Sequence, residues 1–208
     1  VTGTAVSLVK EHSFNYYHFV FECLPKLLLI LQRGLFEQNG LSSVDEIVTV
    51  LIDEDVPSQC VEYLDSVISL PYSVVRVAND EVICCERLIY CSPFFDSLDN
   101  IRSDRFYIRD FYVDRFAVEL VKKAFQLKIS QPCNPKSLIY LDRRQTQMRK
   151  IINSSEVEEV LQRYGYQSVF ADEYSLKEQI EIFHGARVVV GASGAAFSNL
   201  IHMQPETT

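Results

Sequence analysis

The chain has 208 residues and a mass of 23.9 kDa, enough for one large domain or two smaller ones whose cores need no disulfide or metal staples. With 48% hydrophobic residues, 23% charged residues and only 7 Gly and 7 Pro, the composition excludes a disordered, collagen-like or low-complexity chain. The 20 Lys plus Arg stand against 28 Asp plus Glu, and the net charge of -8 disfavours nucleic acid and anionic membrane surfaces as partners. An anionic ligand must therefore meet a local cluster of basic residues.

The sequence predicts a cytoplasmic protein. Its longest apolar run, residues 27–31, is too short to span a membrane, and the N-terminus lacks a signal pattern. The 6 Cys are scattered without a CxxC pair, which favours buried free thiols. Association with the inner face of the membrane and homo-oligomerisation are left open. Because the chain starts on a strand and stops at residues 205–208 just after a helix, we expect it to be part of a longer protein.

The first half alternates between strand and helix patterns. Residues 15–33 are strongly apolar with few charges and are followed by Gly34, which predicts a buried helix. Helical spacing of Phe111, Val118, Val121 and Phe125 predicts a long helix over residues 104–128. The other expected elements are strands at 4–9, 46–52, 74–77 and 82–90 and a helix at 58–67.

The second half alternates more regularly, which predicts a parallel sheet with crossover helices. Two capping boxes, Ser155 with Glu158 and Ser175 with Glu178, mark expected helix starts. A glycine turn, residues 191–194, should open a last helix. The expected strands are 137–141, 166–170 and 187–190, and the expected helices are 156–164 and 176–184.

Three Arg and one Lys lie within residues 143–150, directly after an expected strand: Arg143, Arg144, Arg149 and Lys150. Guanidinium groups offer a planar fork of donors that suits phosphate oxygens, and ligands of parallel sheets lie at the carboxyl ends of the strands. The cluster therefore predicts a diphosphate site, although a solvated basic turn would carry the same pattern.

The turn of Gly191, Ala192, Ser193 and Gly194 joins a buried strand to a helix, where backbone N–H groups favour negative charge. Small residues here could equally serve only to let the helix pack close to the strand. The turn is not a GxGxxG fingerprint and no Walker lysine follows it, which argues against the two commonest nucleotide motifs.

His18 and Glu22 are four residues apart and share one face of an apolar helix. Burial should raise the pKa of the carboxyl towards neutrality, and the imidazole could orient it, which makes either group a candidate general base. A structural hydrogen-bonded pair is an equally good interpretation, and a metal site has the least support because no other ligands cluster nearby.

Taken together, these motifs resemble glycosyltransferase family 61. The blocks that carry the resemblance, in chain order, are Asn15-Tyr-Tyr-His18-Phe with Glu22-Cys-Leu-Pro25, Tyr140-Leu-Asp-Arg143-Arg144 with Arg149-Lys150-Ile-Ile-Asn153, Ser175-Leu-Lys-Glu178-Gln179, and Gly191-Ala-Ser193-Gly194-Ala with Asn199. The resemblance implies an inverting transferase with two Rossmann-like α/β lobes of the B-type glycosyltransferase architecture. It also implies a nucleotide-sugar donor, a glycan acceptor, no metal or other cofactor, and a role in capsular or surface polysaccharide synthesis.

The expected organisation is an acceptor-side lobe at residues 1–102, a connecting helix and linker at 103–133, and an incomplete donor lobe at 134–208, with the active site between the lobes. Glu22 and His18 are the catalytic candidates. The donor-binding candidates are Arg143, Arg144, Arg149, Lys150, Asn153, Gly191, Ser193, Gly194 and Asn199. The family usually has His where this chain has Ser193, so an imidazole contact to the donor is lost.

Two alternatives stay open. One is a catalytically weak protein that binds a nucleotide sugar or acts as a scaffold. The other is a different nucleotide-using α/β enzyme, such as a sugar dehydrogenase or epimerase, although the missing dinucleotide fingerprint counts against it.

Overall fold

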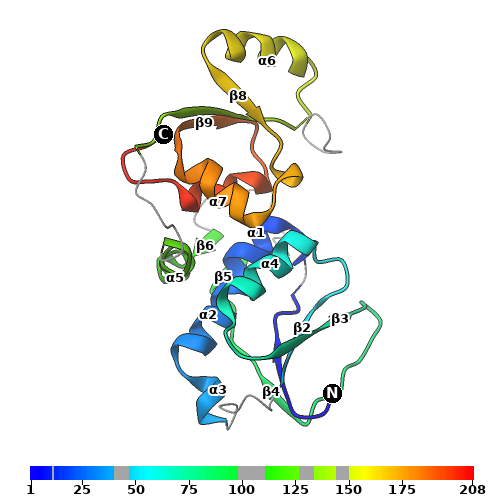
Figure 1. Ribbon diagram of the computed structural model, residues 1–208. Helices are drawn as coiled ribbons and strands as arrows, with labels where there is room; N and C mark the ends of the chain where they lie inside the picture. The colour runs from blue at the N-terminus through cyan, green and yellow to red at the C-terminus, as the bar shows by residue number, and fades with distance from the viewer. Residues whose placement is uncertain (11, 40–46, 98–110, 127–133, 144–149) are drawn as a thin grey trace. The chain divides into compact units, whose positions relative to one another are not determined.

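The computed structural model describes residues 1–10, 12–39, 47–97, 111–126, 134–143 and 150–208 (Figure 1). The chain divides into two compact units, Val1–Ala124 and Phe125–Thr208. Each unit contains a parallel sheet with helices, so the mixed α/β, Rossmann-like fold class expected from the sequence is confirmed. The two units are described in turn.

The first unit is built on a four-stranded parallel sheet in the order β3-β2-β1-β4. The central strand β1 pairs through Val6 with Val50 on one side and Ile89 on the other. The chain moves outward from β1 to β3 and then returns to the far side of β1, so the strand order reverses between β1 and β4. Ligands of such sheets lie outside the carboxyl ends of the strands at this switch point. The strands are β1 (Thr4–Ser7), β2 (Val48–Asp53), β3 (Tyr72–Val77) and β4 (Arg87–Ile89).

The apolar segment after β1 is helical as expected, but it is not one regular helix. It consists of α1 (Tyr16–His18), a π-helical turn η1 (Phe19–Cys23) and α2 (Leu24–Gln32). The Asn15 side chain caps the start by accepting from the Tyr17 N–H at 3.0 Å. The end comes at Gly34, whose φ of 61° suits glycine. Two short helices follow in this unit, α3 (Leu35–Gln38) and α4 (Ser58–Val67).

The helix expected over residues 104–128 is wrong in its first part. Phe111 belongs to β6 (Phe111–Val113), which pairs antiparallel with β5 (Phe95–Ser97). Of the described residues in this range, those of α5 (Arg115–Gln126) are helical, and this helix begins where Asp114 accepts from the Phe116 N–H at 2.8 Å. Residues 104–110 and 127–128 lie outside the described part of the chain. The strand expected at 82–90 is likewise shorter, because only β4 pairs with the sheet.

The second unit has a three-stranded parallel sheet in the order β8-β7-β9, which confirms the alternation predicted from the sequence. Its switch point lies between β7 and β9. At the outer edge of β9, Thr208 accepts from the Val189 N–H at 2.7 Å and donates to the Arg187 carbonyl at 2.8 Å. The strands are β7 (Ser137–Leu141), β8 (Tyr166–Val169) and β9 (Ala186–Gly191).

Only one of the two expected capping boxes forms. Ser175 and Glu178 cap α7 (Leu176–His184) reciprocally. The Ser155 and Glu158 box is wrong, because α6 (Ser154–Arg163) starts earlier and Glu158 instead accepts from the Ser168 hydroxyl at 2.6 Å. The remaining segments, η3 (Ala171–Glu173) and η4 (Ala195–His202), are 3₁₀-helices, so the expected last α-helix is also corrected.

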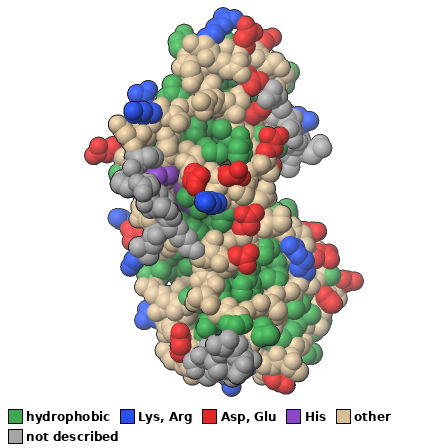
Figure 2. Space-filling model, in the orientation of Figure 1, with side chains coloured by type: hydrophobic (Ala, Val, Ile, Leu, Met, Phe, Trp, Pro, Cys, Tyr) green, Lys and Arg blue, Asp and Glu red, His purple; other side chains and the backbone are tan. Residues whose placement is uncertain are grey.

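The two faces of the second sheet differ in how they are covered (Figure 1). On the α7 side, Ile139, Val189 and Phe183 belong to one buried cluster. On the other side stands α6, none of whose residues is buried. Space-filling Figure 2 shows apolar side chains between charged ones on the visible surface of this part of the chain.

Candidate functional site

In the first unit, the polar loop after β1 is fixed to the end of β2. The Lys10 N–H donates to Asp53 Oδ2 at 3.2 Å, and the Ser13 hydroxyl bonds to the same oxygen. Asp53 is the last residue of β2, and parallel strands β1 and β2 end at the same edge of the sheet. These bonds hold the Lys10 side chain at the carboxyl end of the sheet.

The helical segment brings His18 and Glu22 to the same place. His18 Nδ1 lies 2.8 Å from Glu22 Oε1, and the Lys10 ammonium bonds to Glu22 Oε2. The Glu22 side chain is 3% exposed, while that of His18 is 23% exposed. The predicted pairing of His18 with Glu22 is therefore present, and Lys10 joins it as a third member.

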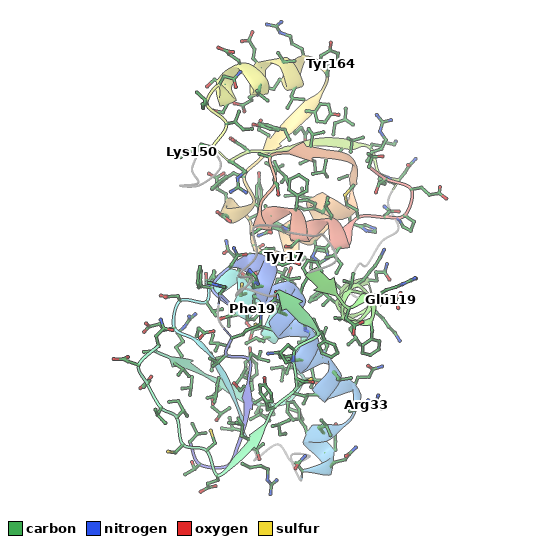
Figure 3. The ribbon with its side chains drawn as sticks, turned by 180° about the vertical axis from the view of Figure 1, so that it is seen from behind. Tyr17, Phe19, Arg33, Glu119, Lys150 and Tyr164 are labelled. Carbon is green, nitrogen blue, oxygen red and sulfur yellow. The ribbon has the colours of Figure 1, made fainter. Side chains whose placement is uncertain are left out.

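Glu22 lies within the π-helical turn, where the Leu24 N–H bonds to the carbonyl of Phe19 rather than to that of Val20. Single π turns of this kind are frequently found at functional sites. The turn is buried at Phe19, Val20 and Cys23, so apolar packing surrounds the carboxylate. In Figure 3, Tyr17 and Phe19 mark the start of this segment.

The expected rise in the pKa of Glu22 is wrong. Burial does raise the pKa, but the hydrogen bonds and positive charges of His18 and Lys10 together outweigh it, so the pKa lies below its usual value. Glu22 is consequently an anion at neutral pH and a poor proton acceptor. A carboxylate that accepts from Nδ1–H fixes an imidazole with its Nε2 lone pair available, which makes His18 the better candidate base.

Aromatic side chains frame the imidazole. The rings of Tyr17 and His12 lie with their centroids 5.3 and 5.8 Å from that of His18. Burial and the negative charge of Glu22 raise the pKa of Tyr17, which keeps its phenol neutral. His12 has a φ of 67°, a left-handed conformation uncommon for residues other than glycine.

In the second unit, the structure joins two motifs that are about fifty residues apart. Arg143 follows β7, and its guanidinium lies against Gly194, which follows β9. A methyl group on Gly194 would fall 1.3 Å from Nη1 of Arg143. Both residues lie at the carboxyl ends of β7 and β9, at the switch point of the sheet. A cation and a glycine turn therefore meet where the sequence predicted a diphosphate.

The other candidate residues near the glycine turn differ in their contacts. A methyl group on Gly191 would lie 2.9 Å from Leu141 Cβ, so this glycine allows β9 to pack closely against β7. Ser193 is exposed, and its hydroxyl makes no hydrogen bond within the described part of the chain. Asn199 is buried and donates to Gln179 Oε1 at 2.7 Å, which ties η4 to α7. Contact of these residues with a donor remains a prediction.

The basic loop is described only at its ends. Arg144 and Arg149 lie outside the described residues. Lys150 is exposed just before α6 (Figure 3), and Asn153 is the N-cap residue of that helix, with its amide 3.3 Å from Glu156 Oε2. A cavity of about 570 Å³ opens between α6 and the ends of β7 and β9, and its mainly apolar lining includes Tyr140, Val157, Val160 and Gly191.

Sequence reasoning missed Lys10, His12, Ser13 and Asp53. The signal was available, because residues 10–13 directly follow one expected strand and Asp53 directly follows the next, and strands of a parallel sheet end at the same edge. The π turn had no such signal, since hydrophobic periodicity does not separate it from an α-helix. The described residues contain no group of three or more His, Cys, Asp or Glu arranged to hold a metal ion.

Comparison with known proteins identifies the family. A family model described as Glycosyltransferase 61 matches residues 16–208. The matched range includes every candidate residue named from the sequence, but not Lys10, His12 and Ser13, which precede it. The chain belongs to glycosyltransferase family 61. Membership implies glycosyltransferase activity, with a sugar donor and an acceptor as substrates. No curated protein matches the chain. The helices that the structure describes are all too short or too polar to cross a membrane.

Proposed function

We propose that this family 61 glycosyltransferase is an inverting enzyme that moves a hexosyl or pentosyl group from a nucleotide-sugar donor to a hydroxyl of a glycan acceptor in polysaccharide biosynthesis. The observation that carries the proposal is the contact of the Arg143 guanidinium with Gly194 at the switch point of the second sheet. A nucleoside diphosphate requires such a cation beside backbone N–H groups, both as a ligand and as a leaving group.

The first unit supplies the base. The acceptor hydroxyl gives its proton to Nε2 of His18 while its oxygen attacks the anomeric carbon of the donor. Glu22 accepts a hydrogen bond from Nδ1–H of His18 and stabilises the imidazolium that forms. Lys10 neutralises the charge of Glu22 before the reaction, so the carboxylate does not require a protonated His18 as its ion-pair partner. Glu22 is thus a positioning residue rather than the base.

The second unit stabilises the leaving group. The bond between the anomeric carbon and the β-phosphate oxygen breaks, and the electron pair leaves with the nucleoside diphosphate. Arg143 and the basic residues that follow it balance the charge that develops on the phosphate, in the role that a metal ion has in other transferases. Attack on the face opposite the leaving group inverts the anomeric configuration.

The test is a thermal-shift panel of nucleotide sugars, followed by turnover with the stabilising donor. A ligand that binds only the folded chain raises its Tm, so one class of sugar nucleotide should stabilise the protein. NMR of the product should then show the anomeric configuration opposite to that of the donor. Retention of configuration would contradict an inverting mechanism, and stabilisation by nicotinamide dinucleotides alone would indicate a different enzyme.

The serine at position 193 favours a second candidate function, that of a catalytically weak protein that binds a nucleotide sugar. Its hydroxyl is exposed where the family usually has an imidazole. Donor-dependent stabilisation without turnover would support the binding protein. A gain in transfer rate in Ser193→His would show that the missing imidazole limits catalysis.

A further inference from the structure

A lysine is buried in the first unit, and no carboxylate of the described residues forms an ion pair with it. Lys26 lies on α2 and is 1% exposed. Its ammonium faces the ring of Tyr90, with Nζ 5.6 Å from the ring centroid. The ion pairs and hydrogen bonds formed by the described residues do not involve its side chain. Burying a cation against an aromatic ring alone costs folding free energy, because the cation–π contact compensates for only a small part of the lost hydration.

The π turn explains why Lys26 lacks the partner that its sequence position offers. Glu22 precedes Lys26 by four residues, the spacing at which a carboxylate and an ammonium pair on an α-helix. The extra residue in the turn changes the direction of the side chains that follow, and the Glu22 carboxylate instead bonds to Lys10 and His18. The fold thus separates two groups that a regular helix would pair.

Lys26 also lies at the end of the first sheet where ligands bind. Tyr90 directly follows β4 and is 59% exposed, so the ring that contacts the ammonium reaches the surface. Burial raises the pKa of Cys91, the residue after Tyr90, and the charge of Lys26 opposes that rise, so the ammonium acts on Cys91 as well. The ammonium therefore lies by the carboxyl end of β4, the strand that forms the switch point with β1.

We infer that Lys26, beneath the ring of Tyr90, forms a binding site for an oxyanion, a carboxylate or phosphate group carried by the acceptor. The inference rests on the proposed function for its assignment to the acceptor, because the candidate base lies in the same unit. His18 precedes Lys26 by eight residues, about 12 Å along a helix. The anionic group would therefore lie on a part of the acceptor away from the reacting hydroxyl. Its contact with Lys26 would favour acceptors that carry an acidic group.

Direct binding of small anions tests the site without any turnover. Calorimetry or ligand-observed NMR compares glucuronate, inorganic phosphate and, as the neutral counterpart, glucose. The parent should bind glucuronate and phosphate more tightly than glucose. Lys26→Met should weaken binding of both anions at least about tenfold, as expected for a lost charge-assisted contact, and Lys26→Arg should retain it. Arg33→Met is the matched control, because it removes an exposed cation at the end of the same helix (Figure 3) and should change nothing.

Two further measurements separate the alternatives. The Tm of Lys26→Met should equal or exceed that of the parent, because a buried charge without a partner is replaced by an apolar side chain of similar shape. A clear fall in Tm would assign the ammonium a structural role and overturn the proposal. Equal anion binding by Lys26→Met and the parent would also overturn it.

Measuring the affinity for the nucleotide sugar shows whether the oxyanion belongs to the acceptor or to the donor. Lys26→Met should bind the nucleotide sugar as tightly as the parent does. If it loses donor affinity instead, the oxyanion is the donor's phosphate and the acceptor assignment is wrong. Failure of the proposed function would appear as absent donor binding and turnover, and glucuronate binding would still be measured independently of both.

Discussion

The two units place charge at the ends of their sheets in opposite ways. In the first unit, the carboxylate of Glu22 is surrounded by side chains, with Lys10 and His18 on its two oxygens. In the second unit, the Arg143 guanidinium lies against the backbone of Gly194. A network of side chains orients a proton acceptor, while a cation on a glycine turn leaves space for a ligand anion. This difference is consistent with the proposed function, in which the first unit transfers the proton and the second binds the anion.

The largest expected effect is on catalysis in the first unit. His18→Gln should reduce kcat about 100-fold to 10,000-fold at saturating substrates, the usual cost of losing a general base. Glu22→Gln should reduce kcat less, because the amide oxygen can still accept from Nδ1–H of His18. Both variants should bind the donor normally, as measured by calorimetry. A dead, folded Glu22→Gln beside an active His18→Gln would reverse the two roles.

The next effect tests whether burial of a histidine makes the second unit acid-sensitive. His202 is buried against Phe125 and near His184, and burial lowers its pKa from 6.5 to about 4. Below pH 6.5 the unfolded chain takes up a proton that the folded chain resists. Stability should thus be complete above pH 6.5 and fall by about 3 kcal/mol as the pH approaches 4.

Chemical denaturation of the parent and of His202→Leu across pH 4 to 7 measures this effect. The variant should lose stability less steeply than the parent as the pH falls through this range. An identical pH dependence in both proteins would show that other groups cause the acid sensitivity.

A third prediction concerns the contact that defines the anion site. Gly194→Ala would push the end of the Arg143 side chain out of place, so nucleotide affinity should fall about tenfold or more, and Arg143→Ala should cost a similar 1.5–3 kcal/mol. The double variant should bind no worse than either single variant, because both changes remove the same contact. Gly185→Ala is the control, since its methyl group would meet Glu181 O at an ordinary 3.4 Å. Additive losses would show that the two residues act separately.

The smallest effect distinguishes the two helices on opposite faces of the second sheet. Ser175→Ala removes a formed capping box and should lower the free energy of unfolding by about 1 kcal/mol. Ser155→Ala should change it by only a few tenths, because the hydroxyl follows the helix start and caps nothing there. Equal losses in denaturant titrations would mean that the cap geometry of α6 differs from the one described.

Most strands and helices, and their order, could be predicted from local sequence patterns. Residues 58–67, 137–141 and 176–184 were predicted with the bounds observed for α4, β7 and α7. The alternation of strand and helix predicted the parallel sheets as well. Periodicity, caps and turn residues act within a few positions, so they can be recognised without the rest of the chain.

The partners of most charged groups at the candidate site became visible only in the folded chain. The bond of Lys10 to Glu22 and the contact of Arg143 with Gly194 join residues that are distant in sequence. The direction of the Glu22 pKa shift depended in part on the bond of Lys10. Burial alone predicted a rise, and two partners together reverse it: His18, four residues earlier in the chain, and Lys10, which reaches Glu22 from the loop after β1. The pKa of a buried group depends on the sum of its burial and all its neighbours in space, and the sequence showed only one of the two charged neighbours of Glu22.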